Sequence, residues 1–202
     1  FPEFQVISHA VLPPDIPEDA VVARAAAGDL PSMLGGDIDH LPGKGGILVA
    51  DPVMKQKLRR RYEEMFPGKR LIGISWRSGN RDSAAVRSLD LPYWKPLFDL
   101  PDCAFISLQY GDNTRDMEEL KAQLGDQVYW DLEINPMGDM DPFTAQISAM
   151  DMVSSVDNST VHFAGGLGKP CCAMLPLNSD WRWQTERSDT VFAKATLAEY
   201  CR

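Results

Sequence analysis

The stretch from residue 151 to residue 176 constrains the fold most, because it reads as a strand, a tight turn, a helix and a second strand. Met152 to Val156 are short and apolar, and residues 157–160 can cap a helix. Gly168-Lys169-Pro170 end that helix before a second apolar run at 171–175. Strands joined by a crossover helix run parallel, so this βαβ unit predicts an α/β sheet.

Polar residues directly follow the first of these strands: Asp157, Asn158, Ser159 and Thr160. Ligands of parallel sheets gather at the carboxyl ends of the strands. The N-terminus of a helix also offers unpaired N–H groups and positive partial charge. The four residues therefore predict a phosphate site. The same residue types cap helices in general, so an ordinary N-cap is the alternative.

The rest of the chain alternates between strands and helices. From Leu71 the apolar patterns predict strands at 71–76, 104–109, 128–132, 152–156 and 171–175, with helices at 91–100, 113–124, 143–150 and 159–168 between them. This order predicts a doubly wound, mostly parallel, Rossmann-like sheet. An additional helix starts at Asp51-Pro52, and its basic run at 55–61 is expected to be a solvated face. A short strand and helix are expected within Thr190 to Tyr200.

Proline and glycine mark a change of composition before residue 46. Pro13-Pro14, Gly35-Gly36 and the glycines at 43–46 interrupt residues 1–45. We interpret 1–45 as an irregular segment, the tail of a preceding domain or an interdomain connection, and 46–202 as the Rossmann-like domain. A start at Phe1 suggests a fragment of a longer protein.

The composition excludes several classes of partner. The formal net charge of −9 argues against non-specific binding to nucleic acid or acidic membranes. No apolar run reaches the roughly 20 residues of a membrane span, and no signal peptide is visible, so a cytoplasmic location is expected. The four cysteines show no Cys-x-x-Cys spacing and the three histidines are far apart, so no metal site is predicted. Asp141 is expected to be an N-cap, not a metal ligand.

A second candidate for anion binding follows the strand at 71–76. The loop holds Arg77, Gly79, Asn80 and Arg81, and Arg87 lies within ten residues of Arg77. Guanidinium groups could converge there on a diphosphate, or pair with surface carboxylates. His162, one helical turn after Asp157, could donate to a phosphate or sugar or be a neutral core histidine. Trp181 and Trp183 could stack on a base or close a core.

These motifs resemble a known family. Val156 to Pro170 is similar to the donor-site segment of heptosyltransferase-like glycosyltransferases, with the following residues in matching places: Asp157, His162, Ala164, Leu167, Gly168 and Pro170. Ile74 to Asn80 and Asp180 to Trp183 resemble the subset of that group often fused to tetratricopeptide repeats. The resemblance extends over residues 50–202.

The resemblance implies the carboxyl-terminal, nucleotide-sugar-binding half of a two-domain GT-B glycosyltransferase. It gives Asn158, Ser159 and Thr160 as backbone donors to the phosphates, and Asp157 as an acceptor toward sugar or ribose. Arg87 stands where the family keeps a basic side chain near the diphosphate, and Arg77 and Arg81 are looser matches. The catalytic base of the group usually lies in an amino-terminal domain, and residues 1–45 hold no candidate for it.

The implied reaction transfers a sugar from a nucleoside diphosphate to a glycan or protein acceptor, without a cofactor. A metal-free site neutralises the leaving group with arginines and a helix dipole, and the sequence provides both. The expected partners are a nucleotide sugar and a further domain or helical repeats of the same polypeptide. A non-catalytic interaction module is the alternative. A dinucleotide enzyme is disfavoured, because Gly165 to Gly168 lie at the end of a helix, not before one.

Overall fold

The computed structural model describes residues 46–79, 84–179, 183 and 195–200, the last six by their backbone alone. Contacts along the chain divide it into two units, Phe1–Leu41 and Pro42–Arg202. All of the described residues belong to the second unit, and the fold below is that of this unit.

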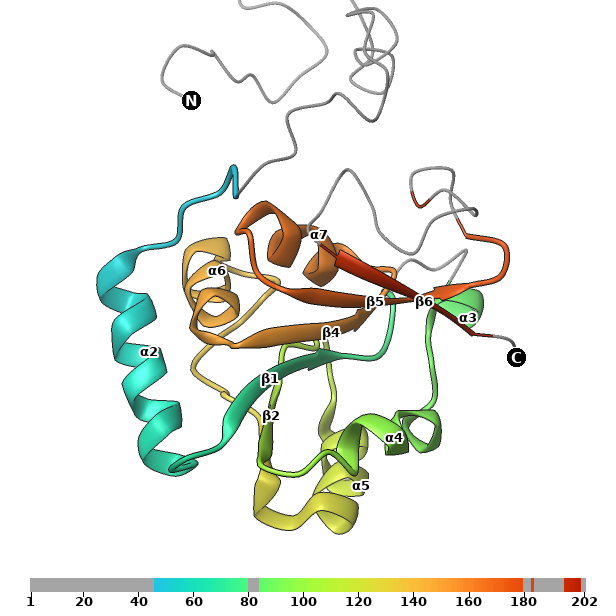
Figure 1. The fold of residues 1–202 in the computed structure, drawn as a ribbon, viewed down its shortest axis with the longest axis horizontal. Coiled ribbons are helices and arrows are strands. Elements are labelled where there is room, and N and C mark those ends of the chain that lie inside the picture. Colours follow the sequence, from blue (N-terminus) through green and yellow to red (C-terminus); the bar gives the residue numbers. More distant parts are fainter. Residues whose placement is uncertain (1–45, 80–83, 180–182, 184–194, 201–202) are drawn as a thin grey trace, which may run out of the picture. The chain divides into compact units, whose positions relative to one another are not determined.

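A six-stranded parallel sheet forms its centre (Figure 1). The strands are β1 (Arg70–Ser75), β2 (Cys103–Ser107), β3 (Val128–Tyr129), β4 (Met152–Val156), β5 (Cys171–Pro176) and β6 (Ala195–Tyr200). Their spatial order is β3-β2-β1-β4-β5-β6. The chain thus builds outward from β1 in one direction, returns, and builds outward from β4 in the other. The prediction of a doubly wound Rossmann-like sheet is confirmed.

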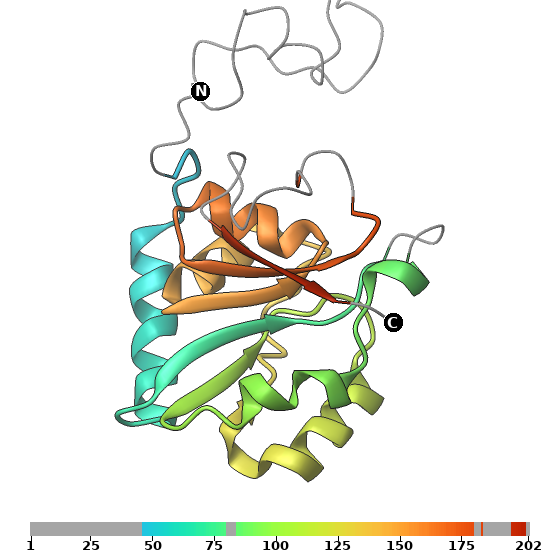
Figure 2. The ribbon, with the colours of Figure 1, turned by 45° about the vertical axis from the view of Figure 1, so that its right-hand side comes forward.

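Helices cover both faces of the sheet (Figure 2). The helices are α2 (Pro52–Met65), α3 (Ala84–Arg87), η4 (Leu91–Trp94), α4 (Lys95–Phe98), α5 (Thr114–Leu124), η5 (Gly125–Gln127), α6 (Met140–Ala149) and α7 (Ser159–Gly166). In the view of Figure 1, α2, α6 and α7 lie on one side of the sheet, and α4 and α5 lie on the other. This segregation follows from the return of the chain to the centre after β3, because right-handed crossovers then place their helices on the opposite face.

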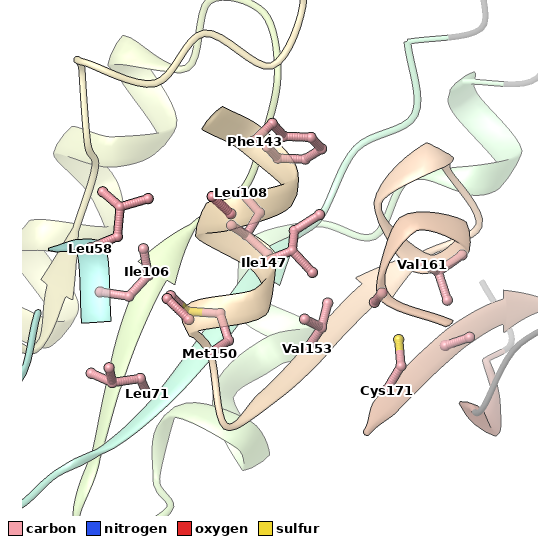
Figure 3. Packing of buried hydrophobic residues seen from close by; sticks show 14 of the residues in the cluster. Leu58, Leu71, Ile106, Leu108, Phe143, Ile147, Met150, Val153, Val161 and Cys171 are labelled. Atoms are coloured by element: carbon pink, nitrogen blue, oxygen red, sulfur yellow. The ribbon is translucent and has the colours of Figure 1, made fainter. Parts of the chain in front are cut away.

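Each face has its own apolar core. On the first face, Leu58 of α2, Phe143 and Ile147 of α6, and Val161 of α7 pack with Val153 of β4 (Figure 3). On the second face, residues of η4, α4 and α5 pack against the strands: Leu91, Trp94, Phe98, Met117 and Leu120. Burying one such side chain contributes about 1.5–3 kcal/mol, so both cores stabilise the packing of the helices on the sheet.

Helix ends differ from the sequence prediction in detail. Asp51 caps α2 as expected, accepting from the N–H groups of Val53 (2.8 Å) and Met54 (3.2 Å). The expected cap Asp141 is wrong: Asp139 accepts from the N–H of Asp141 (3.0 Å), and α6 starts at Met140. The earlier start places Pro142 in the first turn, where its missing N–H costs nothing.

Two further predictions differ. The helix expected at 91–100 consists of the 3-10 turn η4 followed by one turn of α-helix. In the segment expected as strand and helix, residues 195–200 form only the strand β6, which pairs with β5, and 190–194 lie outside the described residues. Of the described helices, none is long and apolar enough to cross a membrane.

The basic run of α2 is not simply a solvated face. Arg59 donates to the carbonyl of Ala149 (2.9 Å) and to Asp151 (2.7 Å). Arg61 is paired with the buried carboxylate of Asp131, which also accepts from the hydroxyl of Tyr62 (2.7 Å). Arg59 therefore fastens α2 to the carboxyl end of α6, and Arg61 fastens it to the loop after β3.

Candidate functional site

The loops after β1 and β4 lie next to each other at the carboxyl edge of the sheet. These two strands are paired neighbours, with Ser75 opposite Ser155 at their carboxyl ends. The strand order reverses between them, and such a switch point is where α/β sheets bind ligands. The predicted site residues at 77–79 and 157–162 therefore belong to one edge of the sheet.

Asn158 joins the two loops through its side chain. Its Oδ1 accepts from the N–H of Thr160 (2.9 Å) and the hydroxyl of Ser155 (3.0 Å). Its Nδ2 donates to Oγ of Ser75 (2.8 Å) and to the carbonyl of Arg77 (3.0 Å). The side chain thus uses both acceptor sites and both donors within the protein. Asn158 caps α7 and holds the β1 loop, and the cap expected from the sequence is present.

Gln109, which follows β2, supports the same loop and was not among the predicted site residues. Its Oε1 accepts from the N–H groups of Trp76 and Arg77, both at 2.8 Å, and its Nε2 donates to the carbonyl of Arg77 (3.1 Å). Gln109 is 3% exposed. The available signal was a polar residue at the end of a buried apolar run, where a glutamine has backbone groups to bind.

Asp157 and Arg87 form an ion pair at the edge. Arg87 ends the single turn of α3, and its Nε lies 3.3 Å from Oδ2 of Asp157. The side chain of Asp157 is only 2% exposed, whereas that of Arg87 is 25% exposed. Among the described residues, Oδ2 of Asp157 has no hydrogen-bond donor. This oxygen is a buried acceptor beside a cation, at the point where β4 ends.

Arg77 makes its contacts with the start of α5. Its guanidinium lies 3.0 Å from Oδ2 of Asp116 and donates to Oδ1 of Asn113 (3.1 Å) and the carbonyl of Asp112 (3.2 Å). Asn113 does not cap α5 with its side chain; Asp112 accepts from the N–H of Thr114 instead (3.1 Å). In this structure Arg77 and Arg87 contact different carboxylates, those of Asp116 and Asp157, and neither of these is an exposed surface group.

Gly79 is needed for a close approach. Its N–H donates to the hydroxyl of Tyr110 (2.7 Å), and a Cβ at this position would lie 2.7 Å from Cε2 of that ring. Any larger residue would have to displace Tyr110 or the loop. Asn80 and Arg81, also predicted for this loop, lie outside the described residues.

Of the three predicted site residues in α7, one is exposed and the other two are partly or fully buried. Ser159 is exposed, while Thr160 is fully buried and its N–H is already bound by Asn158. His162 is half-buried and stacks on Trp183, with ring centroids 5.2 Å apart and an interplanar angle of 20°. Trp183 belongs to the apolar core, so this ring closes a core. Trp181 lies outside the described residues.

The described residues show no cluster of three or more metal-ligating His, Cys, Asp or Glu side chains. Positive charge at the switch point comes from Arg87 and from the N-terminus of α7. These groups suit an oxyanion such as a phosphate. The buried oxygen of Asp157 suits a hydroxyl donor beside it.

Comparison with known proteins places the fold. The chain matches no protein-family model. It is 28% identical over 164 residues to Protein FlbA of Caulobacter vibrioides; the match covers 80% of this chain and 27% of FlbA. The chain thus spans about a quarter of the length of this relative.

Two solved structures share the architecture. One is ADP-heptose lps heptosyltransferase II from E. coli, with a TM-score of 0.56 and 14% identity, covering 75% of this chain and 44% of the enzyme. The other is a family 9 glycosyl transferase from Veillonella parvula, with a TM-score of 0.55 and 12% identity, covering 77% of this chain and 43% of that protein. The likeness shows a glycosyltransferase-like fold, the fold that the resemblance implied.

Proposed function

We propose that residues 46–202 are the carboxyl-terminal, donor-binding domain of a GT-B glycosyltransferase. The full-length protein would transfer a sugar from a nucleoside-diphosphate sugar to a glycan or protein acceptor. One observation carries the proposal: the switch point combines the N-terminus of α7, the cation of Arg87 and a buried oxygen of Asp157 that lacks a donor among the described residues. The likeness of the fold to two glycosyltransferases supports it.

The proposed roles follow from the contacts. The diphosphate is bound by Arg87 and the exposed start of α7 at Ser159, and Asp157 accepts from a hydroxyl of the ribose or sugar. Asn158 contributes as a positioning residue, because its side chain is fully used in holding the β1 loop to α7. His162 contributes through its stack on Trp183, which fixes the helix.

In the proposed mechanism, groups of the protein stabilise the negative charge of the leaving group. A departing nucleoside diphosphate is stabilised by a guanidinium and by a helix dipole aimed at it, so the reaction needs no divalent ion. The catalytic base and the acceptor site are assigned to the remainder of the polypeptide, a further domain or helical repeats. Residues 1–45 would be the tail of that domain or the connection to it.

Calorimetric titration of the chain with UDP, GDP, ADP and CMP tests the ligand class. We expect weak binding of at least one nucleotide, because the match covers less than half of each of the two glycosyltransferases, and no effect of a chelator. Binding of none would favour a non-catalytic interaction module. Binding that a chelator abolishes would contradict the metal-independent mechanism.

Substitution of Arg87 tests the place of the site. Arg87→Ala removes a charge-assisted hydrogen bond to the diphosphate worth about 1.5–3 kcal/mol, which corresponds to a roughly tenfold to hundredfold loss of affinity. Arg87→Lys should fall between, because the charge stays while the planar fork is lost. Arg60→Ala, on the exposed side of α2, should leave the affinity within about twofold, since an exposed charge outside the site contributes little.

Loss of Arg87 also leaves Asp157 without its cation, so affinity and stability must be separated. The double variant Arg87→Ala with Asp157→Asn removes both charges of the pair and should unfold close to wild type in urea. Its nucleotide affinity should remain low. Wild-type affinity in this folded double variant would contradict the placement of the diphosphate at Arg87.

The interaction module remains the second candidate because of the ion pairs themselves. Arg77 and Arg87 both contact carboxylates in the structure, at 3.0 and 3.3 Å. A protein that had lost its nucleotide would keep such pairs as structure. The titration with nucleotides decides between the two functions.

A further inference from the structure

A pocket of about 350 Å³ opens between the start of η4 and the first two turns of α5. It is separate from the groups assigned to the diphosphate, because its lining includes no residue of α7 and neither Arg87 nor Asp157. Of the predicted site residues that the structure describes, the pocket shares Arg77 alone. The proposed function does not use this pocket.

One wall of the pocket is apolar and firmly held. It consists of Trp76, Leu89, Leu91 and Pro92. The first three are at most 5% exposed and belong to the core on this face of the sheet. The N–H of Leu89 donates to the carbonyl of Trp76 (3.0 Å), and the indole N–H of Trp76 donates to Asp116 (2.5 Å). The wall is therefore preformed and offers an apolar surface at the edge of the core.

The facing wall is the charged side of α5. Asp112, Asp116 and Glu119 recur at helical spacing, which places three carboxylates along one side of the helix and its cap. Asp116 is compensated by Arg77 (3.0 Å). Asp112 accepts from the N–H and the hydroxyl of Thr114, and these hydrogen bonds lower its pKa. Among the described residues, the lining holds four carboxylates, Asp90 included, and two arginines, Arg77 and Arg115, so negative charge is in excess.

We propose that this pocket binds an organic cation, an ammonium or guanidinium group carried on an apolar chain. The apolar chain lies against Leu89, Leu91 and Pro92, and the cationic group lies between Asp112 and Glu119. Both parts are required, because an exposed carboxylate alone binds a cation only weakly in water. A lysine or arginine side chain of a partner segment and a free alkylamine share this chemistry.

The indole N–H of Trp76 is a direct reporter of binding, because it donates to a carboxylate within the pocket. We would follow that resonance and the amides of α5 by nitrogen-proton NMR of the 202-residue chain at constant ionic strength. The probes are N-acetyl-leucyl-arginine amide, n-hexylammonium chloride and the neutral N-acetyl-leucyl-glutamine amide. We expect saturable shifts with both cations in the millimolar range and much smaller shifts with the neutral dipeptide. Binding of the dipeptide cation alone would assign the source to a polypeptide.

A matched pair of variants locates the cation. Glu119→Gln should weaken the arginine dipeptide about two- to fivefold, the effect of one partly exposed ion pair. Glu118→Gln, an exposed neighbour on the same helix that does not line the pocket, should leave the affinity unchanged. Equal losses in the two variants, equal shifts with the neutral dipeptide, or no saturable shift with any cation would overturn the proposal. The nucleotide titration is read separately, so either result stands without the other.

Discussion

Two buried amide side chains fix the backbone at the centre of the candidate site. The carbonyl of Arg77 accepts from both Asn158 (3.0 Å) and Gln109 (3.1 Å), which come from neighbouring strands on either side of β1. Such fully bonded buried groups hold a loop in one geometry, because any other arrangement leaves polar atoms unpaired. The position of the β1 loop thus depends on residues that need not touch a ligand.

Replacement of Gln109 tests this support. Gln109→Leu leaves the N–H groups of Trp76 and Arg77 without their acceptor, so we expect a loss of about 2–4 kcal/mol in the free energy of unfolding, measured by urea denaturation. Gln123→Leu, at an exposed position of α5, should change it by less than about 0.5 kcal/mol. A Gln109→Leu protein as stable as the control would show that the loop is held by other means.

The sequence predicted where the site residues lie in the fold, but not the hydrogen bonds that they make. Asp157 and Asn158 were placed at the carboxyl end of a strand because the apolar run and the capping residues are adjacent in the chain. The bond from Asn158 to Ser75 joins residues 83 positions apart, and no local pattern reports such a contact. Gln109 was missed for a related reason: it was assigned to the strand that it follows, and its partners Trp76 and Arg77 lie in the loop after β1.

At the scale of elements, α2 is fastened to the loop after β3 by a buried charge. The Asp131 side chain is fully covered, and it accepts from Tyr62 and pairs with Arg61. Burial, together with the neighbouring carboxylate of Asp131, raises the pKa of Tyr62, so the hydroxyl stays protonated and keeps donating. This cluster connects the first described helix with a loop at the ligand edge of the sheet.

Arg61→Ala should therefore destabilise the fold more than substitution of its exposed neighbours does. Removal of the guanidinium leaves the covered Asp131 side chain without its cationic partner, while the hydroxyl of Tyr62 still donates to it. We therefore expect a loss of about 2–4 kcal/mol in the free energy of unfolding, measured by thermal or urea denaturation. Arg60→Ala, on the exposed side of the same helix, should have little effect. Similar stabilities of the two variants would mean that the ion pair of Arg61 and Asp131 contributes no more to stability than an exposed arginine does.

A second attachment of α2 predicts a dependence on pH. Burial alone would raise the pKa of Asp151, but hydrogen bonds from Arg59 and the N–H of Leu71, together with the charge of Arg59, lower it. A carboxyl group with a lowered pKa in the fold stabilises it above its unfolded pKa of about 3.9. This contribution is lost as the pH falls through the folded value.

The corresponding measurement compares wild type with Asp151→Asn across the acid range. The difference in unfolding free energy should be constant above a pH of about 5 and shrink below about 4. The exposed Asp126→Asn serves as a control and should show a much smaller difference throughout. A difference that grows on acidification would contradict the assignment to Asp151.

The helices illustrate why such attachments could not be predicted. Of the apolar residues at helical spacing in α2, Leu58 and Tyr62 are buried, Met54 is half-buried and Met65 is exposed. Within the basic run, however, the sequence gives no sign that Arg59 and Arg61 meet carboxylates while Arg60 is exposed. Their partners Asp151 and Asp131 lie 92 and 70 positions away, and only the packing of α2 on α6 brings them together.

At the scale of the whole molecule, alternation of strands and helices was sufficient to predict the fold class. It was not sufficient to predict the strand order, because more than one order of a doubly wound sheet fits the same alternation. The observed order decides which loops become neighbours, and it brings the ends of β1 and β4 together. The candidate site is therefore a property of topology, and two of its loops are distant in sequence.

This strand order affects how the chain folds while it is being synthesised on the ribosome. The inner strand β1 needs β4 as its second neighbour, and the contact from Asn158 to Ser75 spans 83 residues. At about 5–20 residues per second, roughly 4–17 seconds of synthesis separate the two strands. During that interval one edge of the apolar strand β1 has no partner, and such edges attract other chains.

A nascent chain halted at Met150 should therefore bind chaperones or hydrophobic dyes, and one that has released β5 should not. The candidate site is therefore also among the last parts of the chain to be protected from aggregation.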